Sequence, residues 1–218
     1  MTRGALVGTA ALTLLLGSSA LPGSSAGDLR VSLQATAAAY RANMVSIARL
    51  AGRDTTYDYY ERLLDDVELL DDQSVPAGYT AAQWSQTTRR IASLDLSLAS
   101  QLLEGSASSI SSIRGLGEVL VRSSRDDTLQ PVALYVPSSY APDRPAPLIV
   151  MLHGHPQSET ALLAPPYIAQ IAEQTGTIIV APWGRGYYDF RGSDSDVYDA
   201  LHAATRAFAI DARKKFLA

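Results

Sequence analysis

The sequence predicts an α/β fold preceded by a helical segment. Apolar residues recur at three- and four-residue steps up to about residue 113, and apolar strand-like runs then alternate with helical segments. Strand, helix, strand, helix, strand in succession is the signature of an open sheet with helices on its faces. We therefore expect a signal peptide over 1–26, a helical unit over 27–113 and an incomplete α/β domain over 114–218.

The first 26 residues have the features of a secretory signal peptide. Arg3 supplies a positive charge, residues 5–16 are apolar, and small residues follow at 18–20 and 24–26. A membrane span needs about 20 apolar residues, so we expect no stable membrane anchor. A buried N-terminal helix is the alternative. The interpretation we favour places the protein in the bacterial periplasm or outside the cell, with a mature chain starting near Leu21 or Gly27.

Composition excludes several classes of function. The net charge is −4 and basic residues form no cluster of the kind that nucleic-acid binding needs, so we expect no nucleic-acid partner. The chain has no cysteine, which rules out a lipoprotein anchor and a disulfide framework. Hydrophobic residues make up 47% and charged residues 18%, as in a globular protein. The fold must therefore be held by its hydrophobic core alone.

Three amphipathic helices are predicted in the helical unit. Their inward-facing residues are expected to be Leu33, Ala37, Tyr40, Met44, Ile47 and Ala51; Tyr57, Tyr60, Leu64 and Val67; and Trp84, Thr88, Ile91, Asp95, Leu98 and Leu102. Gly52, Pro76 and Gly105 interrupt the pattern, and Thr80 with Gln83 forms a capping box for the third helix. Because each helix has one apolar face, we expect a small antiparallel bundle or a cap over the next domain.

The following part is predicted to contain the sheet. Residues 118–123 and 129–136 flank a turn at 125–128 and are typical of a hairpin. Unbroken apolar runs at 148–152 and 177–181 are typical of strands in a parallel sheet that is covered on both faces. Helices are expected over 166–175 and from residue 193 or 194, and another strand begins only at 216–218. The inward residues of the last helix are expected to be Val197, Leu201, Ala204 and Phe208.

The segment with the most chemical information is Leu152-His153-Gly154-His155-Pro156-Gln157, directly after the apolar run at 148–152. It resembles the His-Gly turn of α/β-hydrolases, and most closely the Leu-His-Gly-x-x-Gln form of secreted polyester, feruloyl and acetyl esterases. Two further segments, 135–140 and 181–186, also resemble parts of those enzymes and of prolyl-oligopeptidase-like proteins. Asp196-Val197 and residues 210–213 resemble the start and the end of the helix that precedes the nucleophile. The resemblance spans about 115–218 and implies the N-terminal half of an α/β-hydrolase sheet.

The resemblance also implies an oxyanion hole. Acyl transfer builds negative charge on a carbonyl oxygen, and each of two N–H donors that stabilise this charge contributes about 3–4 kcal/mol. One donor comes from the loop after the third strand, where Gly154 lets the backbone approach the substrate. By position, this donor is the backbone N–H of His155. The resemblance implies no cofactor.

The resemblance gives the remaining polar residues supporting roles. The ring of His153 is expected to bond neighbouring loops, while Gln157, Arg185 and Asp196 support the pocket or the structure. His153 and His155 could instead bind a metal, but no further His or carboxylate cluster accompanies them, and we expect none. The His155 side chain fits an exposed loop residue as well, and Arg185 is either structural or at the pocket rim. His202 is expected to be exposed on a helix.

The catalytic residues are expected to be absent from this chain. In this fold the nucleophile lies on a Gly-x-Ser-x-Gly elbow and the acid and His follow it, but the 218 residues contain no such motif. We predict the N-terminal part of an exported serine hydrolase that cleaves a small-molecule or polymer ester, or a peptide, and is inactive as this fragment. The alternative is a non-catalytic exported protein whose helical unit binds a partner. Without the neighbouring strand, 148–152 is expected to be an exposed sheet edge that aggregates.

Overall fold

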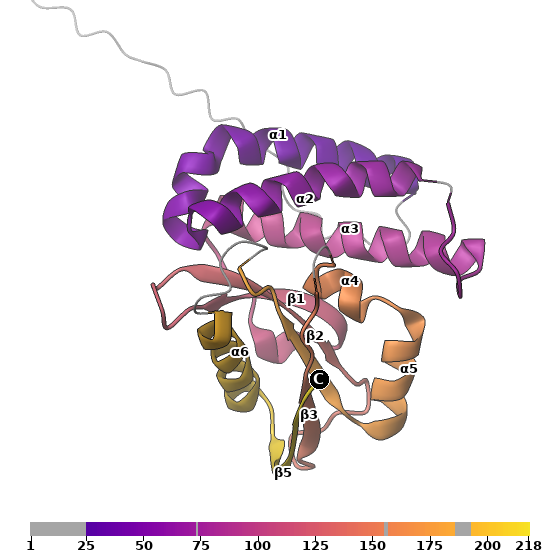
Figure 1. Cartoon of the computed structure of the whole chain (residues 1–218), viewed down its shortest axis with the longest axis vertical. Helices are drawn as coiled ribbons and strands as arrows, with labels where there is room; N and C mark the ends of the chain where they lie inside the picture. The colour runs from indigo at the N-terminus through magenta and orange to yellow at the C-terminus, as the bar shows by residue number, and fades with distance from the viewer. Residues whose placement is uncertain (1–24, 73, 155–156, 186–192) are drawn as a thin grey trace, which may run out of the picture.

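The computed structural model describes residues 25–72, 74–154, 157–185 and 193–218. It contains a five-stranded mixed sheet with helices on both faces, which is the α/β class that the sequence predicts. Helices α1 (Ala26–Ala51), α2 (Arg53–Asp71) and α3 (Ala81–Glu104) lie side by side above the sheet in Figure 1. We call these three helices the α1–α3 layer.

Local sequence signals set the ends of these helices. Ser25 and Asp28 form a capping box at the start of α1, and Thr80 and Gln83 form the predicted one at the start of α3. Gly52 separates α1 from α2 with a φ of 82°, a backbone conformation that L side chains rarely adopt. Each helix therefore has an end at which a capping side chain accepts hydrogen bonds from free backbone N–H groups or a glycine adopts the backbone conformation of the turn.

The buried faces of α1 and α3 largely match the prediction, whereas for α2 only Tyr60 and Val67 of the four predicted residues pack against the core. Tyr57 and Leu64 are exposed on α2, with 52% and 39% of their surface accessible. The buried residues of α2 are instead Thr55, Thr56, Tyr59, Arg62, Leu63 and Asp66. Because four of these six residues are polar or charged, hydrophobic periodicity could not identify this side of the helix.

Trp84 of α3 also differs from its predicted place inside the bundle. Its ring is half-buried and packs edge-to-face on Tyr79, with the ring centres 5.3 Å apart. Leu98 is fully buried, as expected. The bulky side chain at the start of α3 therefore packs on the preceding turn, whereas the middle of the helix contacts the core.

The strands are β1 (Gly115–Arg122), β2 (Leu129–Val136), β3 (Ala146–Val150), β4 (Ile178–Pro182) and β5 (Ile210–Leu217). Their order in the sheet is β1-β2-β4-β3-β5. Strand β2 is antiparallel to β1, as predicted for a hairpin, and to β4. Strand β3 is parallel to both β4 and β5, so the carboxyl ends of these three strands meet at one edge of the sheet.

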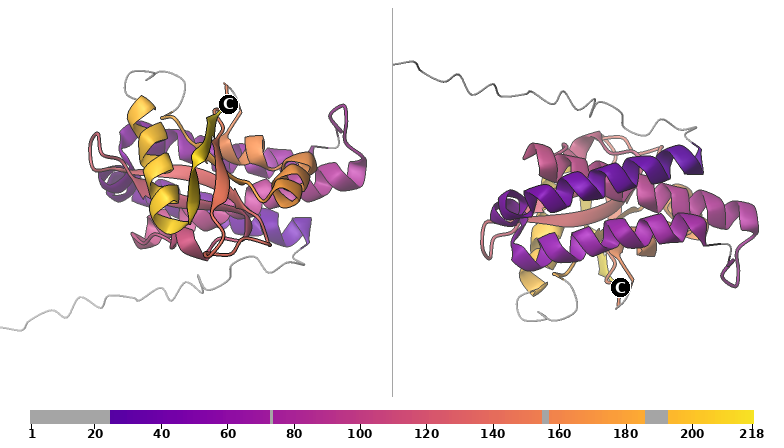
Figure 2. Two further views of the ribbon diagram at one scale, coloured as in Figure 1. Left: turned by 90° about the horizontal axis from the view of Figure 1, so that it is seen from below. Right: turned by 90° about the horizontal axis from the view of Figure 1, so that it is seen from above.

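Helices cover both faces of the sheet (Figure 2). Helix α6 (Ser193–Ala207) covers one face, and α4 (Glu159–Leu163) and α5 (Pro166–Thr175) cover the other. A short 3-10 helix, η1 (Ile110–Ser112), precedes β1. Within the described ranges, no helix combines the length and the hydropathy that crossing a membrane requires.

The α1–α3 layer packs on the hairpin of β1 and β2. Leu120 of β1 and Leu129 of β2 belong to the same buried apolar cluster as Leu33, Tyr59 and Leu98 of the helices. The three helices therefore bury their apolar faces partly against one another and partly against the sheet.

The inward face of α6 matches the predicted one only in part, with Ala204 buried as expected. Its buried residues are Asp196, Ala200, Ala203 and Ala204, whereas Val197 and Leu201 are only half-buried. Small alanines allow α6 to lie close to the sheet, and Asp196 is tolerated inside because it pairs with Arg185. Phe208, just after the helix, is buried as predicted.

Strand β5 corrects two predictions. It begins at Ile210, so residues 210–213 belong to a strand and not to the end of the preceding helix. It also pairs with β3, in the place that the resemblance implies for the strand before the nucleophile, so β3 is not a sheet edge. The edge strands of the described sheet are β1 and β5, and Arg213, Lys214 and Lys215 are exposed on β5. An edge strand needs no hydrophobic pattern, and this is why the apolar-run criterion missed it.

Candidate functional site

The His-Gly turn begins where the carboxyl ends of β3 and β5 lie side by side. The backbone N–H of Leu152 donates to Ala218 O at 2.9 Å, and that of Ala218 donates to Val150 O at 3.0 Å. Gly154 is exposed, and a Cβ placed on it would meet no atom of the described chain within 4 Å. The backbone at Gly154 is therefore open to a ligand.

The remaining residues of the turn are only partly described. His155, the predicted oxyanion donor, and Pro156 lie outside the described residues. The backbone N–H of Gln157 donates to Gly154 O at 2.9 Å, so residues 154 and 157 lie close together at the two ends of the turn. The Gln157 side chain is exposed.

His153 connects the turn after β3 to the turn after β4. Its Nε2 lies 3.1 Å from Trp183 O, and its ring stacks on the Trp183 indole with 5.9 Å between the ring centres. The other ring nitrogen, Nδ1, is buried with no hydrogen-bond partner among the described residues. These contacts leave the His153 ring between the two turns.

A buried cluster of charged side chains, centred on Arg62 of α2, adjoins the Trp183 ring. Arg62 Nε and Nη2 each donate to a carboxylate oxygen of Asp95 on α3 at 2.7 Å. Arg62 Nη1 donates to Glu159 Oε1 at 2.9 Å, and Nη2 lies 3.4 Å from Glu118 Oε1 on β1. All four residues are buried, so each charge depends on the others for compensation.

Aromatic rings and a hydroxyl complete the surroundings of Arg62. Its Cζ lies 5.0 Å from the ring centre of Tyr59 and 5.5 Å from that of Trp183. Nη2 also donates to Thr160 Oγ1 at 2.5 Å. The guanidinium is therefore held by α2, α3, β1, α4 and the turn after β4 together.

The carboxylates of this cluster outnumber the single cation. Burial raises the pKa of Glu118 and of Asp66 well above their ordinary values, and neighbouring carboxylates add to the effect. Burial is the largest single influence on the pKa of Glu159 and raises it, but the Arg62 charge and the hydrogen bonds to the carboxylate together outweigh burial, so the pKa of Glu159 is lowered. The second oxygen of Glu159, Oε2, is buried and has no hydrogen-bond partner among the described residues.

A second charged cluster surrounds Arg185, in the turn after β4. Arg185 Nε donates to Asp196 Oδ2 of α6 and Nη1 donates to Asp126 Oδ2 of the hairpin turn, both at 2.5 Å, while Nη2 donates to Ser123 Oγ at 2.6 Å. The hydrogen bond from Arg185 holds the pKa of Asp126 well below its ordinary value. Arg185 thus connects the β1–β2 hairpin to α6.

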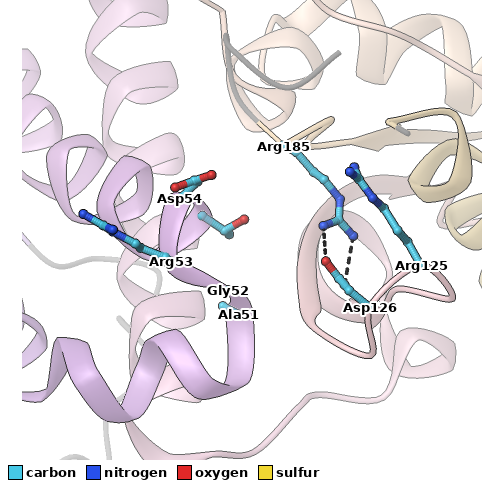
Figure 3. Close-up of a pocket in the computed structure, with 8 residues that line it drawn as sticks. Ala51, Gly52, Arg53, Asp54, Arg125, Asp126 and Arg185 are labelled. Atoms are coloured by element: carbon cyan, nitrogen blue, oxygen red, sulfur yellow. Dashed lines mark hydrogen bonds and ion pairs between the residues drawn. The ribbon is translucent and has the colours of Figure 1, made fainter. Parts of the chain in front are cut away.

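A small polar cavity of about 160 Å³ lies beside Arg185 (Figure 3). Its lining residues are Ala51, Gly52, Arg53, Asp54, Thr55, Arg125, Asp126 and Arg185. Ligand pockets usually measure about 300–1,000 Å³, so this cavity is smaller than a typical substrate pocket. In Figure 3 the Arg185 side chain points to Asp126 and is occupied by that contact.

The structure brings together some of the predicted site residues and separates others. His153 and Gly154 lie at the edge where the parallel strands end, whereas Arg185 and Asp196 form their own cluster at the hairpin turn. His202 is exposed on α6. Among the described residues, no group of three or more His, Cys, Asp or Glu side chains is arranged to bind a metal ion.

Sequence reasoning missed the Arg62 cluster. Two signals were present: Asp95 lies within the apolar stripe of α3, and Glu118 lies within an apolar strand. A charged residue at an inward position needs a buried partner, so both indicated an unrecognised cation. Arg62 itself lies outside the stripe that was assigned to α2, and no periodicity argument selects it.

No protein-family model and no curated protein matches this chain. Among solved structures, S-formylglutathione hydrolase from Staphylococcus aureus is similar with 15% identity and a TM-score of 0.40, over 47% of this chain and 46% of that one. A thermostable esterase matches with 16% identity and a TM-score of 0.36, over 47% and 33% of the two chains. A ferulic acid esterase from Anaeromyces mucronatus matches with 17% identity and a TM-score of 0.36, over 47% of each chain. This chain therefore spans less than half the length of each of these proteins.

Proposed function

We propose that this chain contributes the oxyanion side of the active site in an exported serine hydrolase that cleaves ester bonds. The observation that supports it is the position of the His-Gly turn, which starts beside the end of β5 in a sheet of order β1-β2-β4-β3-β5. A serine on an elbow that continues from β5 would face this turn. The open space at Gly154 is available to a substrate carbonyl.

The chemistry is acyl transfer through a covalent intermediate. The serine oxygen attacks the ester carbonyl, the tetrahedral oxyanion accepts a hydrogen bond from the backbone N–H of His155, and the alcohol leaves. Water then attacks the acyl-enzyme and releases the acid. No step requires a cofactor. The 218 residues contain no Gly-x-Ser-x-Gly, so in this proposal residues outside them supply the nucleophile.

The predicted supporting residues have distinct places in this proposal. His153 holds the turn after β3 against the carbonyl of Trp183. Arg185 and Asp196 stabilise the scaffold, because they pair with each other and with the hairpin and leave no free charge toward Gly154. Gln157 closes the far end of the His-Gly turn through its backbone N–H.

Labelling by a serine-directed fluorophosphonate tests the proposal. We expect no labelling of the 218-residue chain and no hydrolysis of a short-chain nitrophenyl ester. A longer version that carries Gly-x-Ser-x-Gly directly after β5 should show both, and replacing its elbow serine by alanine should abolish both. An unlabelled and inactive longer version would instead favour a non-catalytic binding protein.

We also propose that the protein is exported, with Leu21 as the first residue of the mature chain. The Ser25 capping box supports Leu21 over Gly27, because cleavage before Gly27 would remove a cap that stabilises α1 by roughly 0.5–2 kcal/mol. The intact mass of protein recovered from the periplasm or medium of a bacterial host tests this start. Retention of Met1 in the exported protein would contradict it.

A further inference from the structure

Arg62 contacts both ends of the segment that contains the His-Gly turn. At its carboxyl end, Arg62 donates to Glu159 Oε1 at 2.9 Å and to Thr160 Oγ1 at 2.5 Å. At its amino end, the contact runs through Trp183, whose ring lies under the guanidinium and whose carbonyl oxygen lies 3.1 Å from His153 Nε2. One side chain from α2 therefore restrains both residue 153 and residues 159–160.

The position of Arg62 is set by the α1–α3 layer. Two parallel hydrogen bonds to Asp95 hold the guanidinium plane against α3, and Tyr59 lies one turn earlier on α2 with its ring 5.0 Å from Arg62 Cζ. A bidentate pair of this kind fixes the orientation of the plane as well as its distance. A movement of α2 and α3 would therefore shift the Arg62 guanidinium and change its contacts with Glu159 and Trp183.

We infer that Arg62 is a positioning residue that couples the α1–α3 layer to the His-Gly segment, acting through Glu159, Thr160 and Trp183. Its meaning for catalysis rests on the proposed function, whereas the coupling itself does not. The helices are then part of the machinery that holds residue 153 and residues 159–160, and they are more than a cover for the hairpin.

Glu118 and Glu159 provide a matched pair for the test. Both are buried carboxyl groups that contact Arg62, but Glu159 begins α4 at the end of the His-Gly segment and Glu118 lies on β1, outside it. Glu118→Gln keeps an amide oxygen that can still accept from Arg62 Nη2. Glu159→Gln removes the charge that Arg62 Nη1 binds. The two variants therefore change the same cluster but only one cuts the link to the segment.

The test is amide hydrogen exchange on the 218-residue chain, followed by mass spectrometry of a peptide that covers residues 151–163. Hydrogen bonds to charged groups are strong, so we expect Glu159→Gln to speed exchange of this peptide by roughly tenfold. Thr160→Val, which removes the hydroxyl that Arg62 Nη2 binds, should act in the same direction and decides the matter if Glu159→Gln does not fold. Glu118→Gln should change the exchange by less than about twofold, and a peptide from α1 should be unaffected in all variants.

Trp183 gives a spectroscopic check, because Trp84→Phe leaves it as the single tryptophan. In that background, Arg62→Lys should shift Trp183 emission and increase its quenching by acrylamide, since an ammonium cannot stack on the ring and bind Asp95 together.

Equal effects of Glu118→Gln and Glu159→Gln on exchange, or no effect of Glu159→Gln and Thr160→Val, would overturn the inference. None of these measurements needs a nucleophile. Coupling found together with an inactive longer version would refute the proposed function and leave the coupling standing.

Discussion

The guanidinium carbon of Arg62 on α2 lies over the indole ring of Trp183 after β4, 5.5 Å from the ring centre. The two residues belong to parts of the chain that the sequence assigns to different units. A cation over an aromatic face is stabilised by the electrons of the ring, more strongly so where water is excluded. This contact, together with the carboxylates around Arg62, joins the α1–α3 layer to the carboxyl ends of the parallel strands, where the candidate site lies.

Arg62→Met should destabilise the chain far more than the same change at the surface. Removing the cation leaves Asp95 and Glu159 buried without compensation, which typically costs about 3–5 kcal/mol in the free energy of unfolding. Arg30 on α1 pairs with Asp71 at 3.1 Å, with side chains 46% and 53% exposed, so Arg30→Met should cost less than about 1 kcal/mol. Urea unfolding of both variants measures the difference, and equal losses would contradict the assignment of a buried charge cluster.

Glu118→Gln should change how stability depends on pH. The unfolded chain loses this proton near a pKa of about 4.3, whereas burial in the folded chain raises the pKa well above that value. Between the two values the folded state binds more protons, so the free energy of unfolding falls as pH rises. The variant lacks this loss. Its melting temperature relative to the wild type should therefore increase from about pH 5 to about pH 8, and a difference that is independent of pH would show that Glu118 is ionised.

Arg185→Lys should weaken the connection between the hairpin and α6. An ammonium cannot bridge Asp126 and Asp196 as a planar guanidinium does, and the expected loss is about 1–2 kcal/mol in the free energy of unfolding. Because Arg185 lowers the pKa of Asp126, the stabilisation is present above about pH 4 and is lost as pH falls further. Denaturation at neutral and acid pH tests this.

Arg122 provides the control for that measurement. It pairs with Asp127 in the same hairpin at 3.3 Å, but the two side chains are 56% and 85% exposed. Arg122→Lys should change the free energy of unfolding by less than about 0.5 kcal/mol at either pH. A loss as large as that of Arg185→Lys would mean that the hairpin tolerates no substitution and that the bridge has no special role.

Val150→Lys should unfold the sheet. Val150 is 4% exposed and pairs with β4 on one side and β5 on the other, so the variant places an unpaired charge in the core. Ala212→Lys on the exposed part of β5 should be tolerated. Circular dichroism and size-exclusion chromatography distinguish the two outcomes, and a folded, monomeric Val150→Lys chain would mean that β3 is an edge after all.

Much of the fold could be predicted because its signals are local. The helix ends at Thr80 and Gly105 follow from capping chemistry, and the hairpin follows from two strand-like runs around a turn. The position of β5 could not be predicted in the same way. Four of its five residues from Asp211 to Lys215 are charged, and a strand that is paired on one edge only is set by its neighbour more than by its own composition.

The candidate site could be predicted only where the chain carries a motif. Leu152-His153-Gly154 marks the end of β3, and its contact with Trp183 extends this segment to the turn after β4. The Arg62 cluster is different, because its members come from α2, α3, β1 and α4 and meet only in the folded chain. No spacing rule connects residues that are so far apart in sequence, and only the unexplained inward charges of Asp95 and Glu118 pointed to it.

The most direct test of the account is a disulfide between β3 and β5, since the function proposed here depends on these strands being neighbours. The chain has no cysteine, so Ile149→Cys with Phe216→Cys gives a clean pair at partner positions in the two strands. Neighbouring strands lie about 4.8 Å apart, within the range of roughly 4.4–6.8 Å that a disulfide spans between Cα atoms. In the control, Ala212→Cys replaces Phe216→Cys; position 212 lies about 13 Å from position 216, toward the start of β5. Mild oxidation should close the first pair within the monomer and leave the control reduced, as intact mass and non-reducing electrophoresis would show. A first pair that stays reduced, or a control that closes as fast, would contradict the strand order on which the proposed site is built.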